Sequence, residues 1–468
     1  MIFQFTSDSL CSIIKPSNRK GDIMKTFISL FTAAVMILTA WFCIPVDLSG
    51  NAPIQDQPTV DSFSPVLRFM VCSDTHVHGK DDKLRLERIA KALDFCYGEA
   101  EKDANHSTLD AVLVAGDVTN DGYDEQFASF EEVVKQSLRN ETDLLAIVAK
   151  NHDGYQGKSC RGKISKITGN DADYHVVIGG CHFIGISTSS LEALRYDLRQ
   201  RIQLKQQLDA AVKDDPTKPI FVIHHEHVRG TVYGSSRFEG WGVNHFSAIL
   251  KEYPQIVDFS GHSHYPLNDP RSIWQGAFTA VGTGSISYME VTVDKDRTLH
   301  PEYEGKPECS YEASAQAWLV EVDAANRIRL RGFDVNDGVY LCEYLIENVA
   351  DPSTYVYTPE NQKDKSSAPQ FSAGVGLSVA QKDGKYVVTC PKADSTDGKP
   401  VELYRIRVQN ENGKEVFTKY IVNNYWLPAD KWLDSVDFEI DAKPGYQVSV
   451  VAENVYDMAS EPLTATIG

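Results

Sequence analysis

Short apolar runs and stretches of helical spacing alternate along the first two thirds of the chain. The apolar runs, each typical of a buried strand, are residues 66–72, 111–115, 144–148, 220–223 and 256–259. Apolar residues recur at helical spacing over residues 86–96, 123–138 and 194–208. Strands that alternate with helices in this way predict a mixed α/β core.

The pattern changes after residue 276, where only strands are predicted. The expected strands are residues 287–293, 317–322 and 327–333, and a stretch rich in Pro, Ser, Thr, Asn and Lys follows at residues 351–369. Beyond it, residues 404–408 and 446–452 alternate between apolar and polar, which is typical of a β-sandwich. We therefore expect a first domain over residues 61–348, a linker over 349–371 and an all-β domain over 372–468.

The first 52 residues have the features of a leader. Met24 and Lys25 precede an apolar run from Phe27 to Val46, and polar sequence follows. This order predicts a signal peptide or an uncleaved N-terminal anchor, with Met24 as the true start. We therefore expect export to the periplasm or the cell surface. Cleavage, lipidation and retention as a membrane anchor all stay open.

Charge and cysteine content narrow the classes of partner. The chain has 468 residues and a formal net charge of -19. That charge argues against binding to a nucleic acid duplex, because neutralising phosphates requires Lys and Arg. It permits a small phosphate ester held by metal ions, which invert the local charge. The nine cysteines are scattered, so they predict no disulfide framework.

Each of the five predicted core strands runs directly into residues that can bind metals. These strand ends are residues 73–76, 116–122, 150–153, 224–227 and 261–264. His262 and His264 alone could be ordinary polar loop residues, although alternate residues of an extended segment face one side. In open α/β sheets, however, ligands collect beyond the carboxyl ends of strands. Carboxylate and imidazole together favour iron, manganese or zinc, and one carboxylate can bridge two ions about 3.5–4 Å apart.

The order Asp-x-His, Gly-Asp, Asn-His-Asp, His and Gly-His-x-His over residues 66–335 resembles the calcineurin-like metallophosphoesterase superfamily, in its phosphodiesterase-like branch. The resemblance implies a four-layer α/β/β/α sandwich and a metal-dependent hydrolase of small phosphate esters. It implies two ions, of iron, manganese or zinc, and a metal-bound hydroxide that attacks phosphorus. The implied ligands are Asp74, His76, Asp117 and His264 for the first ion, and Asp117, Asn151, His224 and His262 for the second. His152 is implied to lie outside the coordination shell, where it stabilises the transition state or protonates the leaving oxygen.

Three positions depart from the pattern of the superfamily. Lys150 stands where glycine is usual, and Glu226 stands where proline is usual, so His225 is the fallback ligand if the register is shifted. Asp121 stands where phosphoprotein phosphatases carry an arginine. An acidic side chain cannot bind a phosphate, so the sequence argues against that branch of the superfamily.

The alternative from another functional class is a catalytically decayed protein that binds a partner through its β-sandwich. The choice between phosphomonoesterase and phosphodiesterase stays open.

The C-terminal segment resembles a fibronectin type III domain. Residues 446–454, followed by Ser460, Glu461 and Pro462, are similar to the last two strands of that immunoglobulin-like module. The usual early tryptophan is absent, and Cys390 stands near its place. The resemblance implies a spacer or a binding module whose partner is a glycan or a protein at the cell surface.

Overall fold

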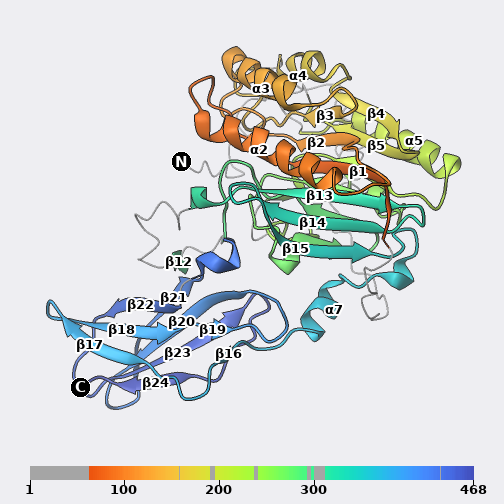
Figure 1. Ribbon diagram of the computed structural model, residues 1–468. Helices are drawn as coiled ribbons and strands as arrows, with labels where there is room; N and C mark the ends of the chain where they lie inside the picture. The colour runs from red at the N-terminus through yellow and green to blue at the C-terminus, as the bar shows by residue number, and fades with distance from the viewer. Residues whose placement is uncertain are drawn as a thin grey trace, which may run out of the picture. The chain divides into compact units, whose positions relative to one another are not determined.

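The computed structural model describes residues 63–157, 159–189, 195–236, 241–291, 297–299, 311–432 and 434–468 (Figure 1). The leader predicted over residues 1–52 lies outside the described residues. In the part of the chain that the structure describes, no helix is both long enough and apolar enough to cross a bilayer.

The first sheet has six strands in the order β15-β14-β13-β1-β2-β3. Their bounds are β1 (Pro65–Cys72), β2 (Ala111–Ala115), β3 (Asp143–Ile147), β13 (Gln316–Asp323), β14 (Ile328–Asp334) and β15 (Val339–Ile346). β1, β2 and β3 are parallel, whereas β13 pairs with β1 antiparallel. The strands predicted at residues 66–72, 111–115 and 144–148 are therefore confirmed.

The second sheet also has six strands, in the order β10-β11-β9-β6-β5-β4. Their bounds are β4 (Asp173–Ile178), β5 (Cys181–Ile186), β6 (Ile220–Ile223), β9 (Ile256–Ser260), β10 (Ile273–Gln275) and β11 (Thr279–Gly282). The strands β5, β6, β9 and β11 are parallel neighbours, so their carboxyl ends lie at one edge.

One hydrophobic core contains side chains of both sheets. The ring of Phe69 on β1 contacts the rings of Phe183, Phe221 and Phe259, which lie on the second sheet, edge-on. The next residue, Met70, points the other way, as successive strand residues do. It belongs to a second cluster that includes side chains of α2 (Lys83–Ala100), α3 (Asp124–Ser137) and α4 (Cys160–Thr168).

Two further helices of the first domain lie, in sequence, between strands of the second sheet. α5 (Leu198–Asp214) contacts β5, and α6 (Ser247–Leu250) is a single turn. The helix predicted over residues 194–208 begins at Leu198, because the side chain of Asp197 caps it by accepting the N–H of Gln200. The mixed α/β organisation is confirmed, whereas the α/β/β/α order of layers stays a prediction.

The strand predicted at residues 287–293 is wrong for its described part, residues 287–291, which form a loop. The buried residues Met289 and Val291 gave the alternation of a strand. They pack instead against a cluster that contains Tyr425 and Trp426 of the C-terminal part. The N–H of Glu290 donates to the carbonyl of His264 at 3.0 Å, so this loop lies beside a predicted ligand.

The C-terminal part is all-β, as predicted. One sheet has the order β12-β21-β20-β23-β24 and another the order β17-β18-β22, and side chains of both share one core. The edge strand β12 comes from the range predicted for the first domain and pairs with β21. The bounds are β12 (Arg297–Leu299), β17 (Ser378–Lys382), β18 (Lys385–Pro391), β20 (Val401–Gln409), β21 (Glu415–Val422), β22 (Ser435–Ile440), β23 (Gln447–Asn454) and β24 (Leu463–Thr466). The fibronectin type III topology stays a prediction.

The stretch predicted as a linker carries structure of its own. It contains the 3-10 turn η5 (Pro352–Thr354), the helix α7 (Pro359–Asp364) and the short strand β16 (Gln370–Phe371), which pairs with β19 (Ala393–Asp394). The hydroxyl of Tyr355 donates to the carbonyl of Pro254, and that of Tyr357 donates to the carbonyl of Leu345. These buried tyrosines fix the stretch to the first domain.

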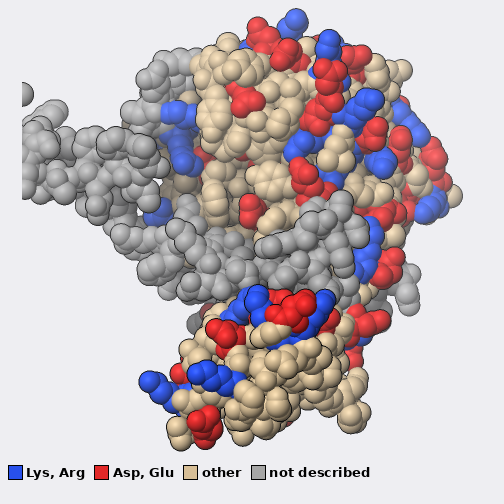
Figure 2. All heavy atoms as spheres, turned by 90° about the vertical axis from the view of Figure 1, so that its left-hand side faces the viewer, with Lys and Arg blue, Asp and Glu red and all other residues tan. Residues whose placement is uncertain are grey.

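Charged side chains of both signs are interspersed on the face shown in Figure 2. Ion pairs such as Lys205 with Glu252 at 2.9 Å and Arg139 with Glu101 at 2.7 Å compensate surface charge locally. Exposed pairs of this kind contribute little to stability, so the hydrophobic cores hold the fold.

Candidate metal centre

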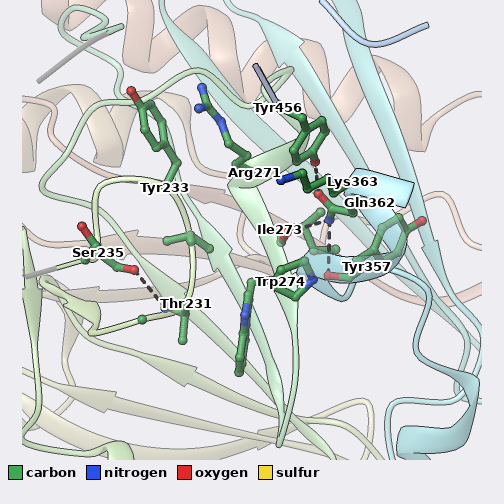
Figure 3. A pocket seen from close by; sticks show the side chains of 14 residues that line it. Thr231, Tyr233, Ser235, Arg271, Ile273, Trp274, Tyr357, Gln362, Lys363 and Tyr456 are labelled. Atoms are coloured by element: carbon green, nitrogen blue, oxygen red, sulfur yellow. Dashed lines mark hydrogen bonds between the residues drawn. The ribbon is translucent and has the colours of Figure 1, made fainter. Parts of the chain in front are cut away.

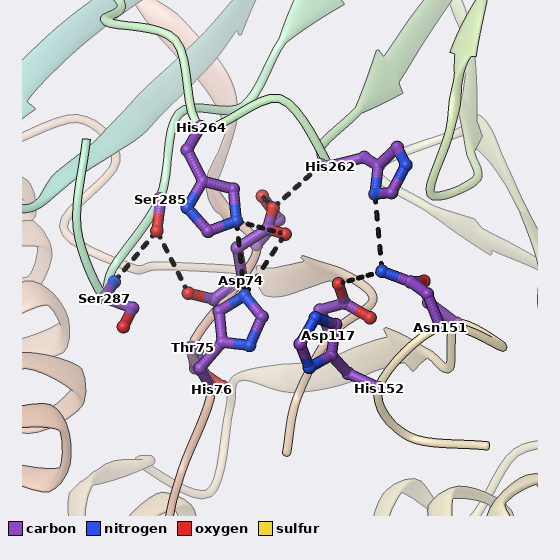
Figure 4. Close-up of polar contacts among 12 residues, drawn as sticks. Asp74, Thr75, His76, Asp117, Asn151, His152, His262, His264, Ser285 and Ser287 are labelled. Atoms are coloured by element: carbon purple, nitrogen blue, oxygen red, sulfur yellow. Dashed lines mark hydrogen bonds and ion pairs between the residues drawn. The ribbon is translucent and has the colours of Figure 1, made fainter. Parts of the chain in front are cut away.

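The carboxyl ends of five parallel strands bring polar side chains to one place (Figure 4). Asp74 and His76 follow β1, Asp117 follows β2, Asn151 and His152 follow β3, His225 follows β6, and His262 and His264 follow β9. Both sheets thus contribute residues, and the site lies where their strand ends meet.

Five of these residues have a left-handed backbone. The φ angles are 51° at Asp74, 44° at His76, 49° at Asp117, 74° at His262 and 57° at His264. This region is uncommon for residues other than glycine, although Asp and His enter it more readily than most. Each such residue costs on the order of 1–3 kcal/mol, and such residues cluster at functional sites. The backbone itself therefore marks this place.

The first ligand group consists of Asp74, His76 and His264, all buried. Oδ1 of Asp74 lies 3.0 Å from Nε2 of His264 and 3.7 Å from Nε2 of His76. Nδ1 of His264 lies 3.1 Å from the carbonyl oxygen of Tyr288. A carbonyl only accepts, so Nδ1 carries the proton and Nε2 can face a cation.

The second ligand group consists of Asp117, His225 and His262, with Asn151 beside them. Nε2 of His225 lies 3.1 Å from Oδ2 of Asp117, and Nδ1 of His225 donates to the carbonyl of Ala115 at 2.8 Å. Nδ2 of Asn151 donates to the same Asp117 oxygen at 2.8 Å. Asp117 also forms a candidate group with His76, a member of the first ligand group, so it is a candidate for a bridging carboxylate.

The structure does not bring His224 to this centre, where the resemblance had implied it. Nε2 of His224 lies 2.8 Å from Oδ1 of Asp258, close enough for an ion pair but not aligned as a hydrogen bond. Both side chains are fully buried. Side chains of consecutive strand residues point to opposite sides, so His225, the fallback, takes the place beside Asp117.

His152 lies at the same centre and is less buried than most of the ligand groups. It forms a third group with His76 and Asp117, and its ring centroid is 4.4 Å from that of His76, nearly perpendicular. Nδ1 of His152 donates to the carbonyl of Asn120 at 2.7 Å. That bond holds the ring and leaves Nε2 available to a bound molecule.

The two carboxyl groups remain ionised despite their surroundings. Burial alone would raise the pKa of each, but the histidines outweigh it. His264, together with His76, holds the pKa of Asp74 well below its usual range, and His225 lowers the pKa of Asp117. Two carboxylates are therefore present to bind cations.

The histidines respond to burial and to these charges. Burial lowers the pKa of His76, and burial with the neighbouring His225 lowers the pKa of His262 to about 4. At His225 burial acts in the same direction, but Asp117 outweighs it and raises the pKa to about 10. A metal ion that binds His225 would take the place of the proton on its ligating nitrogen.

Two residues without an assigned role in the sequence support the ligands. Asp153 is buried and accepts the N–H groups of Thr119 and Ala149, so it ties the second strand end to the third. Burial, with Asp117 nearby, raises the pKa of Asp153 to about 7. In the sequence, only its position directly after Asn151 and His152 pointed to a role for Asp153.

Glu226 supports the His225 segment from the other side. Its carboxylate accepts Nη1 of Arg195 and the hydroxyl of Tyr196, both at 2.6 Å. That hydroxyl also lies 3.3 Å from the backbone N–H of His225 and can accept from it. The residue that departs from the proline pattern therefore anchors a ligand. A charged residue three positions after the end of an apolar strand was its only signal.

Several contacts fit a site built for cations. Oδ1 of Asp117 and Oδ1 of Asn151 are buried and accept no hydrogen bond from any described residue. Nε2 of His76 lies 3.2 Å from Nε2 of His264, and Nε2 of His225 lies 3.2 Å from Nδ1 of His262. Buried acceptors without a partner are costly, and a cation in each group would supply one.

A separate cavity of about 380 Å³ contains none of the predicted ligands (Figure 3). It is lined by Tyr233, Arg271, Trp274, Gln362 and Tyr456, among others. The ring of Tyr233 stacks on that of Tyr265, which directly follows His264. The cavity thus lies behind the last ligand segment and apart from the metal-binding groups.

Comparison with known proteins bears on the first domain as a whole. Residues 67–266 match the calcineurin-like phosphoesterase family, which confirms the resemblance to that family over this range, whereas the phosphodiesterase-like branch stays a prediction. No curated protein matches the chain. GAP50, the anchor in the inner membrane complex of Plasmodium, is similar in structure, with 14% identity, a TM-score of 0.42, and coverage of 60% of this chain and 89% of that one. Purple acid phosphatase PPD1 of yellow lupin (Lupinus luteus) seeds has 13% identity, a TM-score of 0.44, and coverage of 61% and 54%. Neither overlap is close enough to assign an activity.

Proposed function

We propose that this protein hydrolyses small phosphate esters at a dinuclear metal centre. The observation that carries the proposal is the linkage of two ligand groups through His76 and Asp117: Asp117 belongs to the group of His225 and His262, and it also forms a group with His76, a member of the first. The proposed ligands are Asp74, His76, Asp117 and His264 for the first ion, and Asp117, Asn151, His225 and His262 for the second. His225 replaces the earlier assignment of His224.

The donor set suits iron, manganese or zinc, because it combines imidazole nitrogens with carboxylate and amide oxygens. Two such ions, when bound, would neutralise charge on the phosphoryl oxygens and lower the pKa of a water molecule between them. The protein's part is to fix the ligands. The left-handed backbone aims Asp74 and Asp117, and the carbonyls of Tyr288 and Ala115 orient the rings of His264 and His225.

His152 is the proposed general acid. Its Nδ1 is held by the carbonyl of Asn120, so the ring presents Nε2 toward the space beside His76 and Asp117. From there it can stabilise charge on the phosphoryl group or donate a proton to the leaving oxygen.

The leader and the C-terminal domain complete the proposal. The apolar run at residues 27–46 supports export, and the all-β domain suits binding to a glycan or protein outside the cytoplasm. Both of these roles rest on the sequence pattern, and the metal centre does not depend on them.

The test combines metal analysis with hydrolysis, on protein expressed from residue 53. We expect about two equivalents of metal per chain, and hydrolysis of 4-nitrophenyl phosphate, bis(4-nitrophenyl) phosphate, or both. Asp117→Asn should abolish most of the activity, because it disturbs both ligand groups. Asp434→Asn is the matched control, since that side chain is 93% exposed.

The outcomes separate the proposal from its rival. Hydrolysis that survives Asp117→Asn would overturn the proposed centre. Fewer than two equivalents of metal, with no hydrolysis after metal is added, would instead favour a decayed site and a binding role for the C-terminal domain. The two nitrophenyl substrates also decide between monoester and diester.

A further inference from the structure

Three aromatic side chains border the proposed metal centre. The ring of Trp241 stands perpendicular to that of His262, with centroids 4.9 Å apart. The ring of Tyr155 lies 5.3 Å from that of His152, and the ring of Tyr288 lies 4.3 Å from that of His264. Each ring therefore touches a residue of the centre, one at each ligand group and one at the general acid.

Two of these aromatic side chains are more exposed to solvent than large apolar side chains usually are. Tyr155 is 60% exposed, the largest fraction among the exposed large apolar side chains of the described residues, and Trp241 is 36% exposed. Tyr288 is half-buried. Single exposed apolar residues need no explanation, but several gathered around a polar site indicate a surface that a ligand covers. Aromatic faces contribute binding free energy only when something flat or apolar covers them.

The main chain holds Trp241 in place. Its N–H donates to the carbonyl of Gly234 at 3.1 Å, and the next residue starts β8 (Gly242–Val243), which pairs with β7 (His227–Val228). A Cβ atom at Gly242 would lie 1.9 Å from the carbonyl oxygen of Ser235, so only glycine permits this close passage. The backbone at Trp241 is thus closely held before any ligand arrives.

Tyr155 is held in a comparable way. Its N–H donates to the carbonyl of His152 at 3.1 Å, within the turn that carries the general acid. A Cβ atom at the preceding Gly154 would lie 2.8 Å from the carbonyl oxygen of Lys150, so this turn is closely packed as well. Rings that are fixed before binding lose little conformational entropy when they stack on a ligand.

We propose that the substrate is a phosphate ester whose ester group carries a flat aromatic ring, stacked on Trp241 or Tyr155 while its phosphoryl group lies at the metal centre. The inference rests on the proposed function. The shared chemistry is a planar aromatic group, which an aryl ester or a nucleobase both supply. Stacking on protein rings tolerates either, because every such group has a π face.

The test compares two esters that differ only in flatness, benzyl phosphate and cyclohexylmethyl phosphate. Their leaving groups are alcohols of similar reactivity, so a difference reports binding of the ring. Trp241→Ala should lower kcat/KM for benzyl phosphate about tenfold more than for cyclohexylmethyl phosphate. Trp241→Phe keeps a flat ring and should retain most of the difference. Tyr155→Ala, at a more exposed position, repeats the test if Trp241→Ala folds poorly.

A control and a third substrate complete the design. Trp432→Ala is the matched control, because Trp432 is 37% exposed, as Trp241 nearly is, but lies in the C-terminal part. A nucleoside 5′-monophosphate that shows the same selective loss identifies the ring as a nucleobase, and selective loss with benzyl phosphate alone identifies an aryl ester. Equal losses for the flat and the puckered ester in both variants would overturn the inference. If the unaltered protein hydrolyses only the bis(4-nitrophenyl) diester, the methyl diesters of the two alcohols replace the monoesters. Failure of the proposed function looks different, since the unaltered protein would then hydrolyse neither these esters nor either nitrophenyl substrate.

Discussion

The neighbouring histidines His224 and His225 allow the proposed centre to be tested at single-residue precision. They are adjacent in sequence, yet the side chain of His225 lies beside Asp117 and that of His224 lies beside Asp258. His225→Ala removes one of four proposed ligands of the second ion. Changes to residues that merely support a ligand lower metal affinity about 10–100-fold, so loss of a ligand itself should exceed this. We expect the metal content to fall from about two equivalents to about one.

His224→Ala should lower the stability of the protein and leave its metal content unchanged. His224 and Asp258 are both fully buried, so the substitution leaves a carboxylate in the interior without its partner. Leaving a buried polar group without its partner in this way costs about 1–3 kcal/mol of unfolding free energy. The metal content should stay at about two equivalents. The double variant His224→Ala/Asp258→Ala should recover part of the loss, because no buried charge is left unpaired.

Elemental analysis and urea unfolding of the same preparations distinguish the two profiles. The expected pattern is one ion lost with little change of stability in the His225 variant, and lower stability with both ions retained in the His224 variant. If His224→Ala loses an ion while His225→Ala keeps both, the ligand assignment is refuted. The register of the second ligand group would then be shifted by one residue.

Three further predictions concern the surroundings of the centre. Glu226→Gln weakens the anchor of the His225 segment, and calorimetric titration of metal-free protein should show about 10–100-fold lower affinity for one ion; unchanged affinity would contradict this support. Gly122→Ala should lower the unfolding free energy by roughly 1–3 kcal/mol, measured by chemical unfolding, because Gly122 has a φ of 76° and a new Cβ would lie 2.5 Å from the carbonyl oxygen of Asp153; an unaffected stability would speak against it. A chelator should lower the melting temperature reversibly, since an ion at a thousand times its dissociation constant stabilises the folded state by about 4 kcal/mol; a scan that is the same with and without chelator would argue against bound ions.

The sequence predicted the strands of the core and most of the centre because two signals coincide there. Buried strands appear as continuous apolar runs, and polar residues follow each run where the strand ends. Position alone indicated that the strand ends carry metal-capable residues, and the resemblance to a known family then singled out Asp74, Asp117 and His264 among them. The meeting of the strand ends at one place follows from their parallel order, which the structure confirms.

The choice between His224 and His225 could not be made from the sequence, for a physical reason. Phe221 and Ile223 face the core between the sheets, and His225 continues that side of the strand. Ile220 and Val222 face the other side with His224. All four strand residues are apolar and buried, so their pattern does not reveal which side is which.

The loop at residues 287–291 shows a second limit. Alternating burial there predicted a strand, but Met289 and Val291 are buried by Tyr425 and Trp426, more than a hundred residues away in sequence. A local alternation of apolar residues indicates which side chains are buried, but it does not indicate which part of the chain covers them. Long-range contacts of this kind become visible only in the folded chain.

The left-handed residues of the centre have a consequence for how this chain can change over time. Each of the five positions holds a side chain where glycine would relieve the backbone, so the folded state without metal would gain stability from losing its ligands. Mutations that increase stability at the expense of function are common at such places. If selection for the activity ceased, these positions would drift first, toward glycine and asparagine. The two sheets, whose packing does not depend on the ligands, would persist as the same fold without its metal ligands.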